Sequence, residues 1–146
     1  MKKILIIFLS MFVFSIVNAE EIFLSLKKNK VNVRYGPSLE SPIKYIYKKI
    51  HLPIKLIDKK ENFRRIIDLK NNSGWIHVSQ LKKINSLIPL EEKILFKRPS
   101  NFSSPIAKIE KGRMLIVQKC NENWCEIKTG KFKGWIEKNN TWGKIN

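Results

Sequence analysis

Histidine and cysteine, the side chains that most often carry metal or nucleophile chemistry, are nearly missing from this sequence. It has two of each in 146 residues. His51 and His77 fall in the first half, whereas Cys120 and Cys125 fall in the second. A metal site would need more ligands at a recognisable spacing, and a thiol enzyme would need a histidine that supports its cysteine. We therefore expect no metal site and no cofactor.

The sequence also lacks carboxylates that are clearly placed for acid–base catalysis. Glycoside hydrolysis needs two carboxyl groups that flank the substrate bond. The candidates in the first half are Asp58, Glu61 and Asp68, and their positions are typical of turns and surfaces. We therefore predict that the protein is not an enzyme, and a hydrolase or a thiol enzyme is the least supported alternative.

Acidic residues are few compared with basic ones. There are 12 Asp and Glu against 29 Lys and Arg, which gives a formal net charge of +17. Such a charge attracts anionic partners at long range, and salt weakens that attraction. The basic residues are mostly lysines, which a biased composition would also produce, so charge alone does not name a partner.

No apolar run is long enough for a membrane-spanning helix, which needs about 20 residues. The longest, Ile4 to Val17, follows Lys2 and Lys3 and ends in Val17-Asn18-Ala19, with small residues at the −3 and −1 positions of a cut. This pattern is typical of a signal peptide cleaved after Ala19; an uncleaved anchor is the alternative. We expect a basic mature chain that is periplasmic or secreted, with no stable membrane span and no nucleic-acid partner.

What the sequence does contain is a repeat of about sixty residues. Each copy includes Ser-Pro-Ile, then Glu-Asn followed by an aromatic residue, and then Gly-Trp-Ile. These tripeptides begin at Ser41, Glu61 and Gly74 in the first copy, and at Ser104, Glu122 and Gly134 in the second. We predict a signal peptide at 1–19 and two domains, at 20–84 and 85–146.

Both copies show short runs of β-branched and aromatic residues that turn residues interrupt every eight to twelve positions. This pattern is typical of small all-β barrels or sandwiches. We expect five strands in each copy and a short link from Lys82 to Pro89, so that the copies pack together. The strands expected in the first copy are 31–35, 43–47, 54–58, 63–69 and 75–78, and those in the second are 94–97, 106–109, 115–120, 124–129 and 135–138.

The first copy carries a family likeness. Its segment Val31-Asn32-Val33-Arg34-Tyr35-Gly36-Pro37-Ser38, followed by Leu52-Pro53-Ile54 and Gly74-Trp75-Ile76, resembles the bacterial SH3 (SH3b) domain, with Tyr35 where the family usually has serine. The second copy has diverged at its start but keeps Gly134-Trp135-Ile136. The resemblance implies two tandem SH3-like barrels in a small exported protein of the cell envelope. It also implies cell-wall binding, since such domains are widely associated with that role.

The two cysteines have four residues between them, and they lie at opposite feet of a predicted hairpin. An even pair in an oxidising compartment usually forms a disulfide. We therefore predict a structural disulfide between Cys120 and Cys125. A redox-active pair and two unpaired thiols are the alternatives.

Strand alternation separates the tryptophans from their aliphatic neighbours. In the first copy Ile76 and Val78 share one face, and Trp75 and His77 share the other. If the aliphatic faces line the barrels, the indole rings lie outside, where lysines could join them around a sugar-peptide ligand that bears carboxylates. The alternative is that each tryptophan caps its own core or fills the junction between the copies. The candidate ligand-binding residues are Trp75, His77, Trp124 and Trp135.

These observations support two functional hypotheses. The first is an exported, non-catalytic binding module of the cell envelope that associates with peptidoglycan peptide or glycan. The second is a protein-interaction adaptor that binds an exported enzyme or assembly factor through a groove of the barrel.

Overall fold

The structure, a computed structural model, describes residues 19–145. The predicted signal peptide lies outside these residues except for Ala19, so its cleavage stays a prediction. Within the described range no helix has the length and apolar character that crossing a membrane requires.

The described chain is all-β, as the sequence predicts, and it forms two sheets of seven strands each. The first sheet consists of β1 (Phe23–Leu26), β2 (Val31–Arg34), β3 (Ile43–Tyr47), β4 (Pro53–Lys60), β5 (Phe63–Ile67), β6 (Ser73–His77) and β7 (Leu81–Lys83), with the 3-10 turn η1 (Val78–Gln80) before β7. The second consists of β8 (Ser86–Pro89), β9 (Lys93–Phe96), β10 (Pro105–Ile109), β11 (Leu115–Cys120), β12 (Trp124–Thr129), β13 (Phe132–Glu137) and β14 (Thr141–Trp142).

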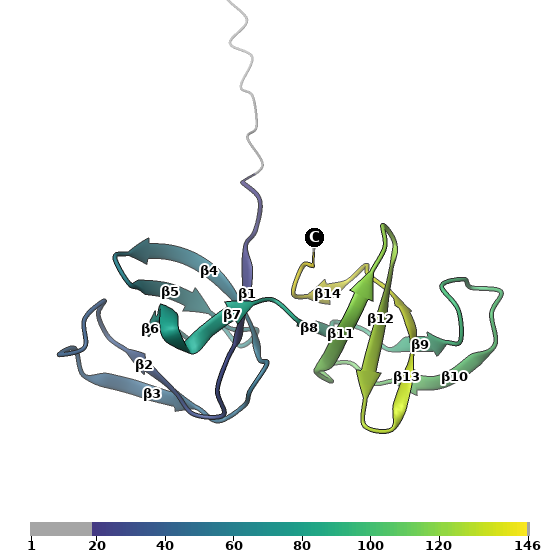
Figure 1. The fold of residues 1–146 in the computed structure, drawn as a ribbon, viewed down its shortest axis with the longest axis horizontal. Helices are drawn as coiled ribbons and strands as arrows, with labels where there is room; N and C mark the ends of the chain where they lie inside the picture. The colour runs from purple at the N-terminus through teal and green to yellow at the C-terminus, as the bar shows by residue number, and fades with distance from the viewer. Residues whose placement is uncertain (1–18, 146) are drawn as a thin grey trace, which may run out of the picture.

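The two sheets have the same topology. Their strand orders are β3-β2-β6-β5-β4-β1-β7 and β10-β9-β13-β12-β11-β8-β14, so every strand of one has a counterpart in the other. Each sheet curls around its own core, and the two barrels lie side by side with β1, β7, β8 and β14 between them (Figure 1). Two tandem SH3-like barrels are therefore confirmed.

Each barrel has a separate apolar core because the inward positions of its strands are aliphatic. Burying one such side chain contributes about 1.5–3 kcal/mol. The first core contains Leu26, Val31, Val33, Ile54, Ile66 and Ile76. The second contains Leu87, Leu95, Ile109, Leu115, Cys125, Ile127 and Ile136.

The prediction of five strands per copy is wrong, because two further strands complete each sheet. β1 pairs with β4 and β7, and β8 pairs with β11 and β14. Most of the expected link from Lys82 to Pro89 belongs to strands, since β7 ends at Lys83 and β8 begins at Ser86. These strands are too short to show the alternation that identifies the longer ones. β8 also ends in a proline, which argues against a strand when only the sequence is known.

Several predicted strand ends also differ from the structure. β2 ends at Arg34, before the turn that contains Pro37, so Tyr35 is not in the strand. β5 ends at Ile67, because Asp68 accepts backbone N–H bonds from Lys70 and Asn72 and starts a turn. Val78 begins η1 instead of continuing β6.

Candidate functional site

Trp75 lies on the outer face of the first barrel, as alternation along β6 predicts. Its neighbours Gly74 and Ile76 are buried, whereas the indole is half-buried. Gly74 is required here because a Cβ at this position would lie 2.4 Å from Val33 Cγ1 and 3.0 Å from the carbonyl oxygen of Arg34. The close approach of β2 thus holds the tryptophan at a defined place on the surface.

Two arginines flank Trp75 across the sheet. Arg65 of β5 and Arg34 of β2 are its register partners on the two neighbouring strands. Register partners in antiparallel strands point to the same face with Cβ atoms about 5 Å apart. The three side chains therefore form one row, with the indole between two guanidinium groups.

A shallow hollow lies beside this row. Its volume is about 140 Å³, and it is lined by Arg34, Tyr35, Lys44, Arg65, Ser73, Gly74 and Trp75. Lys44 reaches across it, since its Nζ donates to the carbonyl oxygen of Ser73 at 2.9 Å and lies 5.6 Å from the centre of the Tyr35 ring. We call Arg34, Lys44, Arg65 and Trp75 the Trp75 face.

The equivalent row of the second barrel has different neighbours. Trp135 of β13 is half-buried between Phe96 of β9 and Glu126 of β12. Lys119 is the next register partner, opposite Glu126, and its Nζ lies 5.5 Å from the centre of the Trp135 ring. We call Phe96, Lys119, Glu126 and Trp135 the Trp135 face.

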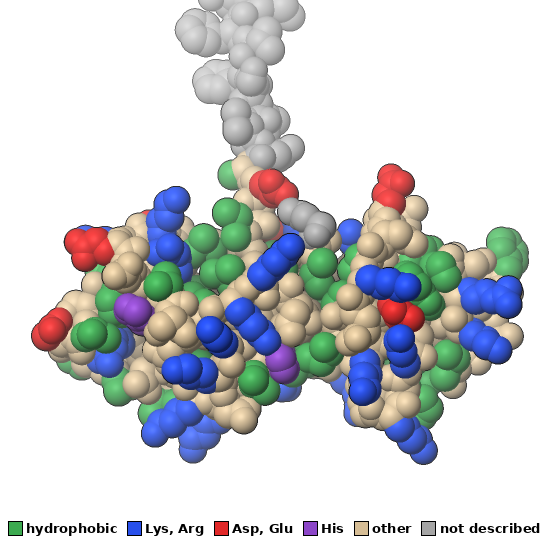
Figure 2. Space-filling view, viewed as in Figure 1, with side chains coloured by type: hydrophobic (Ala, Val, Ile, Leu, Met, Phe, Trp, Pro, Cys, Tyr) green, Lys and Arg blue, Asp and Glu red, His purple; other side chains and the backbone are tan. Residues whose placement is uncertain are grey.

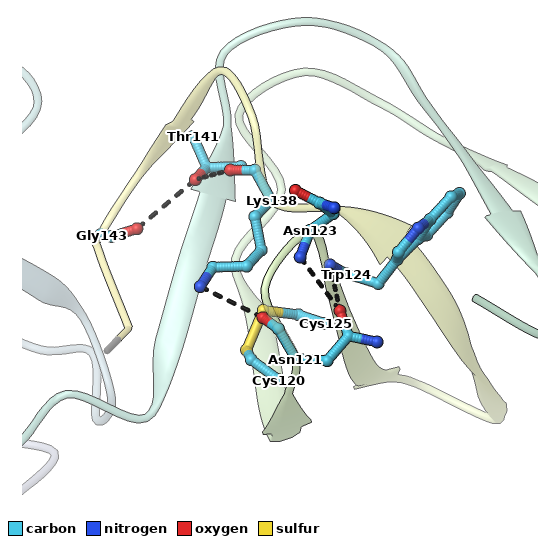
Figure 3. The surroundings of a disulfide bond; sticks show 8 residues. All are labelled: Cys120, Asn121, Asn123, Trp124, Cys125, Lys138, Thr141 and Gly143. Atoms are coloured by element: carbon cyan, nitrogen blue, oxygen red, sulfur yellow. Dashed lines mark hydrogen bonds between the residues drawn. A yellow bond between two sulfur atoms is a disulfide. The ribbon is translucent and has the colours of Figure 1, made fainter. Parts of the chain in front are cut away.

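The disulfide holds the hairpin that carries Trp124. Cys120 and Cys125 are bonded and are register partners of β11 and β12, with Cα atoms 4.1 Å apart (Figure 3). Asn121 Oδ1 accepts the backbone N–H groups of Asn123 and Trp124, which closes the turn. The predicted disulfide is therefore present.

Trp124 points away from the disulfide, toward the outside of the barrel (Figure 3). Its ring lies edge-on to Phe96, with ring centres 5.8 Å apart. It also borders an open hollow of about 500 Å³, whose other lining residues are Asn101, Glu122, Asn123, Glu137, Lys138 and Asn139. Trp124 and Trp135 thus share one outer surface of the second barrel.

His77 shares the outer face of β6 with Trp75, but its contacts are local. Its Nδ1 lies 2.8 Å from Ser79 Oγ and accepts the Ser79 backbone N–H, which caps η1. Its ring meets the Phe63 ring edge-on, with centres 5.2 Å apart. These contacts give His77 a role in positioning η1 against the barrel.

Asp68, Tyr45 and Tyr47 form a hydrogen-bonded cluster of titratable side chains in the first barrel. Asp68 accepts from the Tyr47 hydroxyl at 2.9 Å and from the backbone and side chain of Asn72. Burial raises the pKa of Tyr47, and the hydrogen bond with Tyr45 raises it further. Burial also raises the pKa of Tyr45. The carboxylate is occupied as an acceptor, which agrees with a turn role for Asp68.

Positive charge extends over both barrels. On the face shown in Figure 2, Lys and Arg side chains lie over the whole width of the molecule, while Asp and Glu side chains are few. Among residues 19–145 no three His, Cys, Asp or Glu side chains are grouped so that they could hold a metal ion.

The structure divides the four predicted binding residues between two surfaces, Trp75 with His77 and Trp124 with Trp135. Sequence reasoning missed Arg34, Arg65 and Lys44, which lie beside Trp75 only because of strand pairing. The sequence gives a signal for the two arginines only, since Arg34 and Arg65 are two of five arginines in a lysine-rich chain.

Comparison with known families agrees with this architecture. The family model described as bacterial SH3 domain matches the chain twice, at residues 27–83 and 91–143. No curated protein matches the sequence.

Two solved structures from Trichomonas vaginalis are similar to the chain. NlpC2 is 15% identical with a TM-score of 0.39, and the match covers 86% of this chain and 49% of that one. NlpC1 is 14% identical with a TM-score of 0.39, covering 89% of this chain and 48% of that one. The chain thus spans about half the length of these structures.

Proposed function

The chain belongs to the bacterial SH3 domain family, in two copies, and from that membership we propose that it is a non-catalytic binding module of the cell envelope. In this proposal the protein is exported to the periplasm or secreted, and it associates with peptidoglycan through the peptide or glycan part. No catalytic step is assigned to it.

The observation that supports this proposal most is the Trp75 face. A half-buried indole between two arginines offers an apolar surface and positive charge at one place. A wall fragment combines apolar and polar groups with carboxylates, so it can use both. The indole ring offers a large apolar surface, and arginine is well suited to pair with a carboxylate.

Sedimentation with purified wall material tests the proposal. We expect the exported full chain to pellet with the wall at low salt and to be released at high salt, because screening weakens attraction between exposed charges. Trp75→Ala should weaken retention about tenfold, which corresponds to roughly 1.4 kcal/mol.

Phe102→Ala is the matched control, since Phe102 is a fully exposed aromatic residue on the second barrel. It should leave retention unchanged. A folded protein that stays in the supernatant at low salt would contradict the proposal.

The adaptor hypothesis is the second candidate, and a different surface favours it. β3 is an edge strand, and two of its side chains, Ile43 and Ile46, are 45% and 38% exposed. An exposed edge with apolar side chains can accept a strand from a partner protein. Crosslinking in intact cells distinguishes the two, because one dominant protein adduct without wall retention would favour the adaptor.

A further inference from the structure

We propose that the Trp75 face is a carboxylate-binding site, and that the Trp135 face does not bind anions. This inference rests on the proposed function and makes it more specific: the carboxylates of the wall peptide, presented beside an apolar body, are the groups that the protein recognises. It follows from a charge difference between two rows that occupy equivalent places in the two barrels.

The first step is that the Trp75 face has an arginine free to bind. Arg65 is exposed, and within residues 19–145 it makes no side-chain hydrogen bond or ion pair. Arg34 is anchored, because its Nη1 donates to the carbonyl oxygen of Ser41 at 2.7 Å. A fixed guanidinium and a free one on opposite sides of an indole can both donate to an oxyanion placed over the row.

The two carboxylates near the row, Glu40 and Asp58, form no ion pair with it among the described residues. The hydrogen bond from Ser38 Oγ lowers the pKa of Glu40, and the nearby charge of Arg34 lowers it further. Asp58 is the register partner of Arg65 on β4, but the two side chains form no ion pair. Asp58 Oδ1 instead accepts the backbone N–H of Lys59 at 2.7 Å. Arg34, Arg65 and Lys44 therefore leave the surface with an excess of positive charge.

In the second barrel the equivalent positions carry different residues: one charge is lost, and the charges of the other two are reversed. Phe96 replaces Arg34, Glu126 replaces Arg65, and Lys119 replaces Asp58. Glu126 is only 16% exposed, and its carboxylate pairs with Lys119 at 3.9 Å and with Lys133 at 3.4 Å. An incoming anion would meet Glu126 beside the tryptophan, and the nearby lysines already have a partner.

The hollow of the Trp75 face gives an acidic group a place beside the arginines. Its volume is about 140 Å³, and it is open to solvent, so the rest of a larger ligand can extend beyond it. The remainder of the ligand would lie on the exposed edge of the indole and toward Tyr35, which is 65% exposed.

Chemical modification of the wall tests which anionic group the protein binds. Amidation of wall carboxylates with carbodiimide and ammonia should reduce retention of the full chain at least tenfold. Removal of phosphate polymers with hydrofluoric acid should leave retention unchanged. The reverse result, with phosphate required and carboxylates dispensable, would overturn the assignment.

Single substitutions locate the site. Arg65→Gln should weaken wall retention about tenfold, and it should fold normally because the side chain is exposed and makes no hydrogen bond or ion pair within residues 19–145. Arg98→Gln removes the same charge from an exposed position of the second barrel, and it should change retention less than twofold. Equal losses in the two variants would show that net charge acts alone and would overturn the proposal.

A small probe separates this inference from the proposed function. In NMR titrations of the full chain, an acetylated Ala-Glu-Ala peptide should shift the indole N–H signal of Trp75 and leave that of Trp135 in place. Its diamide should shift neither. A Trp75 shift without wall retention would keep the carboxylate site and reject the wall function, whereas retention without a Trp75 shift would reject the carboxylate site.

Discussion

At the scale of single residues, the glycines of the repeated Gly-Trp-Ile tripeptide have one physical cause. Each lies where a neighbouring strand comes too close for a side chain. A Cβ at Gly134 would lie 2.6 Å from the carbonyl oxygen of Phe96 and 2.9 Å from Leu95 Cγ. The next residue of each tripeptide points its indole outward, and the isoleucine that follows fills the core. The motif is therefore a structural requirement that also places a tryptophan on the surface.

Gly134→Ala should destabilise the second barrel by about 1–3 kcal/mol, the usual cost of forcing extra volume into a packed site. Gly74→Ala should cost less, because its nearest neighbour is a Val33 methyl group that can shift, whereas the nearest neighbour of Gly134 is a backbone oxygen. Urea unfolding of both variants measures the difference. A Gly134→Ala variant as stable as the unmodified protein would contradict the close approach of the strands.

At the scale of elements, the hairpin of β11 and β12 differs from its counterpart, β4 and β5. The turn of the second barrel has a disulfide between register partners and an asparagine, Asn121, that accepts two backbone N–H groups. The turn of the first barrel has no disulfide and contains Glu61 at a φ of 49°. Trp124 thus sits on a cross-linked hairpin, and Phe63 occupies the equivalent place in the first barrel.

Replacing Cys120 and Cys125 together by alanine should lower the free energy of unfolding by about 2 kcal/mol, because a short loop loses its cross-link. Wall retention should not change, since neither sulfur belongs to the Trp75 face. Thermal melts and sedimentation of the same variant measure both quantities. Lost binding at unchanged stability would contradict a structural role for the disulfide.

At the scale of the whole molecule, the last strand of the second barrel ties the two barrels together. Trp142 Nε1 donates to the carbonyl oxygen of Pro53 at 2.9 Å, and the indole meets the Phe23 ring edge-on at 5.1 Å. Two buried serines, Ser25 and Ser86, are hydrogen-bonded across the same junction at 3.3 Å. Trp142, which is not one of the four predicted binding residues, therefore fills the junction between the barrels.

Trp142→Ala should uncouple the barrels, because it removes the hydrogen bond to Pro53 and the ring contact with Phe23. We expect a loss of about 2 kcal/mol, below the cost of a fully buried aromatic residue since Trp142 is half-buried. Calorimetry should then show two separate unfolding transitions. Trp124→Ala, on the outer surface of the same barrel, is the control and should leave the number of transitions unchanged.

The junction should also weaken in acid. Hydrogen bonds from Lys144 at 2.8 Å and Lys55 at 3.2 Å lower the pKa of Glu21 below its ordinary value of 4.5. A carboxyl group whose pKa is lower in the folded state than in the unfolded state stabilises the protein at pH values above its unfolded-state pKa. This stabilisation is lost as the pH falls through the folded-state pKa. Melting temperatures at low salt from pH 7 to pH 3 should show it.

Glu21→Gln should melt lower than the unmodified protein at pH 7, and the two should converge below about pH 4. Glu122→Gln removes a carboxylate from the exposed turn between β11 and β12 and serves as the control for net charge. A gap between Glu21→Gln and the unmodified protein that persists or grows in acid would contradict the ion pairs at the junction.

The resemblance of the first copy to the bacterial SH3 domain predicted the SH3-like barrel, and the sequence by itself determined the all-β class, the two tandem copies, the longer strands and the disulfide. These follow from local signals: the alternation of side chains, turn residues such as Gly36-Pro37, a repeated tripeptide and the spacing of two cysteines. Only the tertiary structure decided that β1, β7, β8 and β14 complete the sheets, that Arg34 and Arg65 flank Trp75, and that Trp142 joins the barrels. Those contacts depend on which strands pair and in what register, and a shift of one residue would move every side chain to the other face. Residues far apart in sequence set that register jointly.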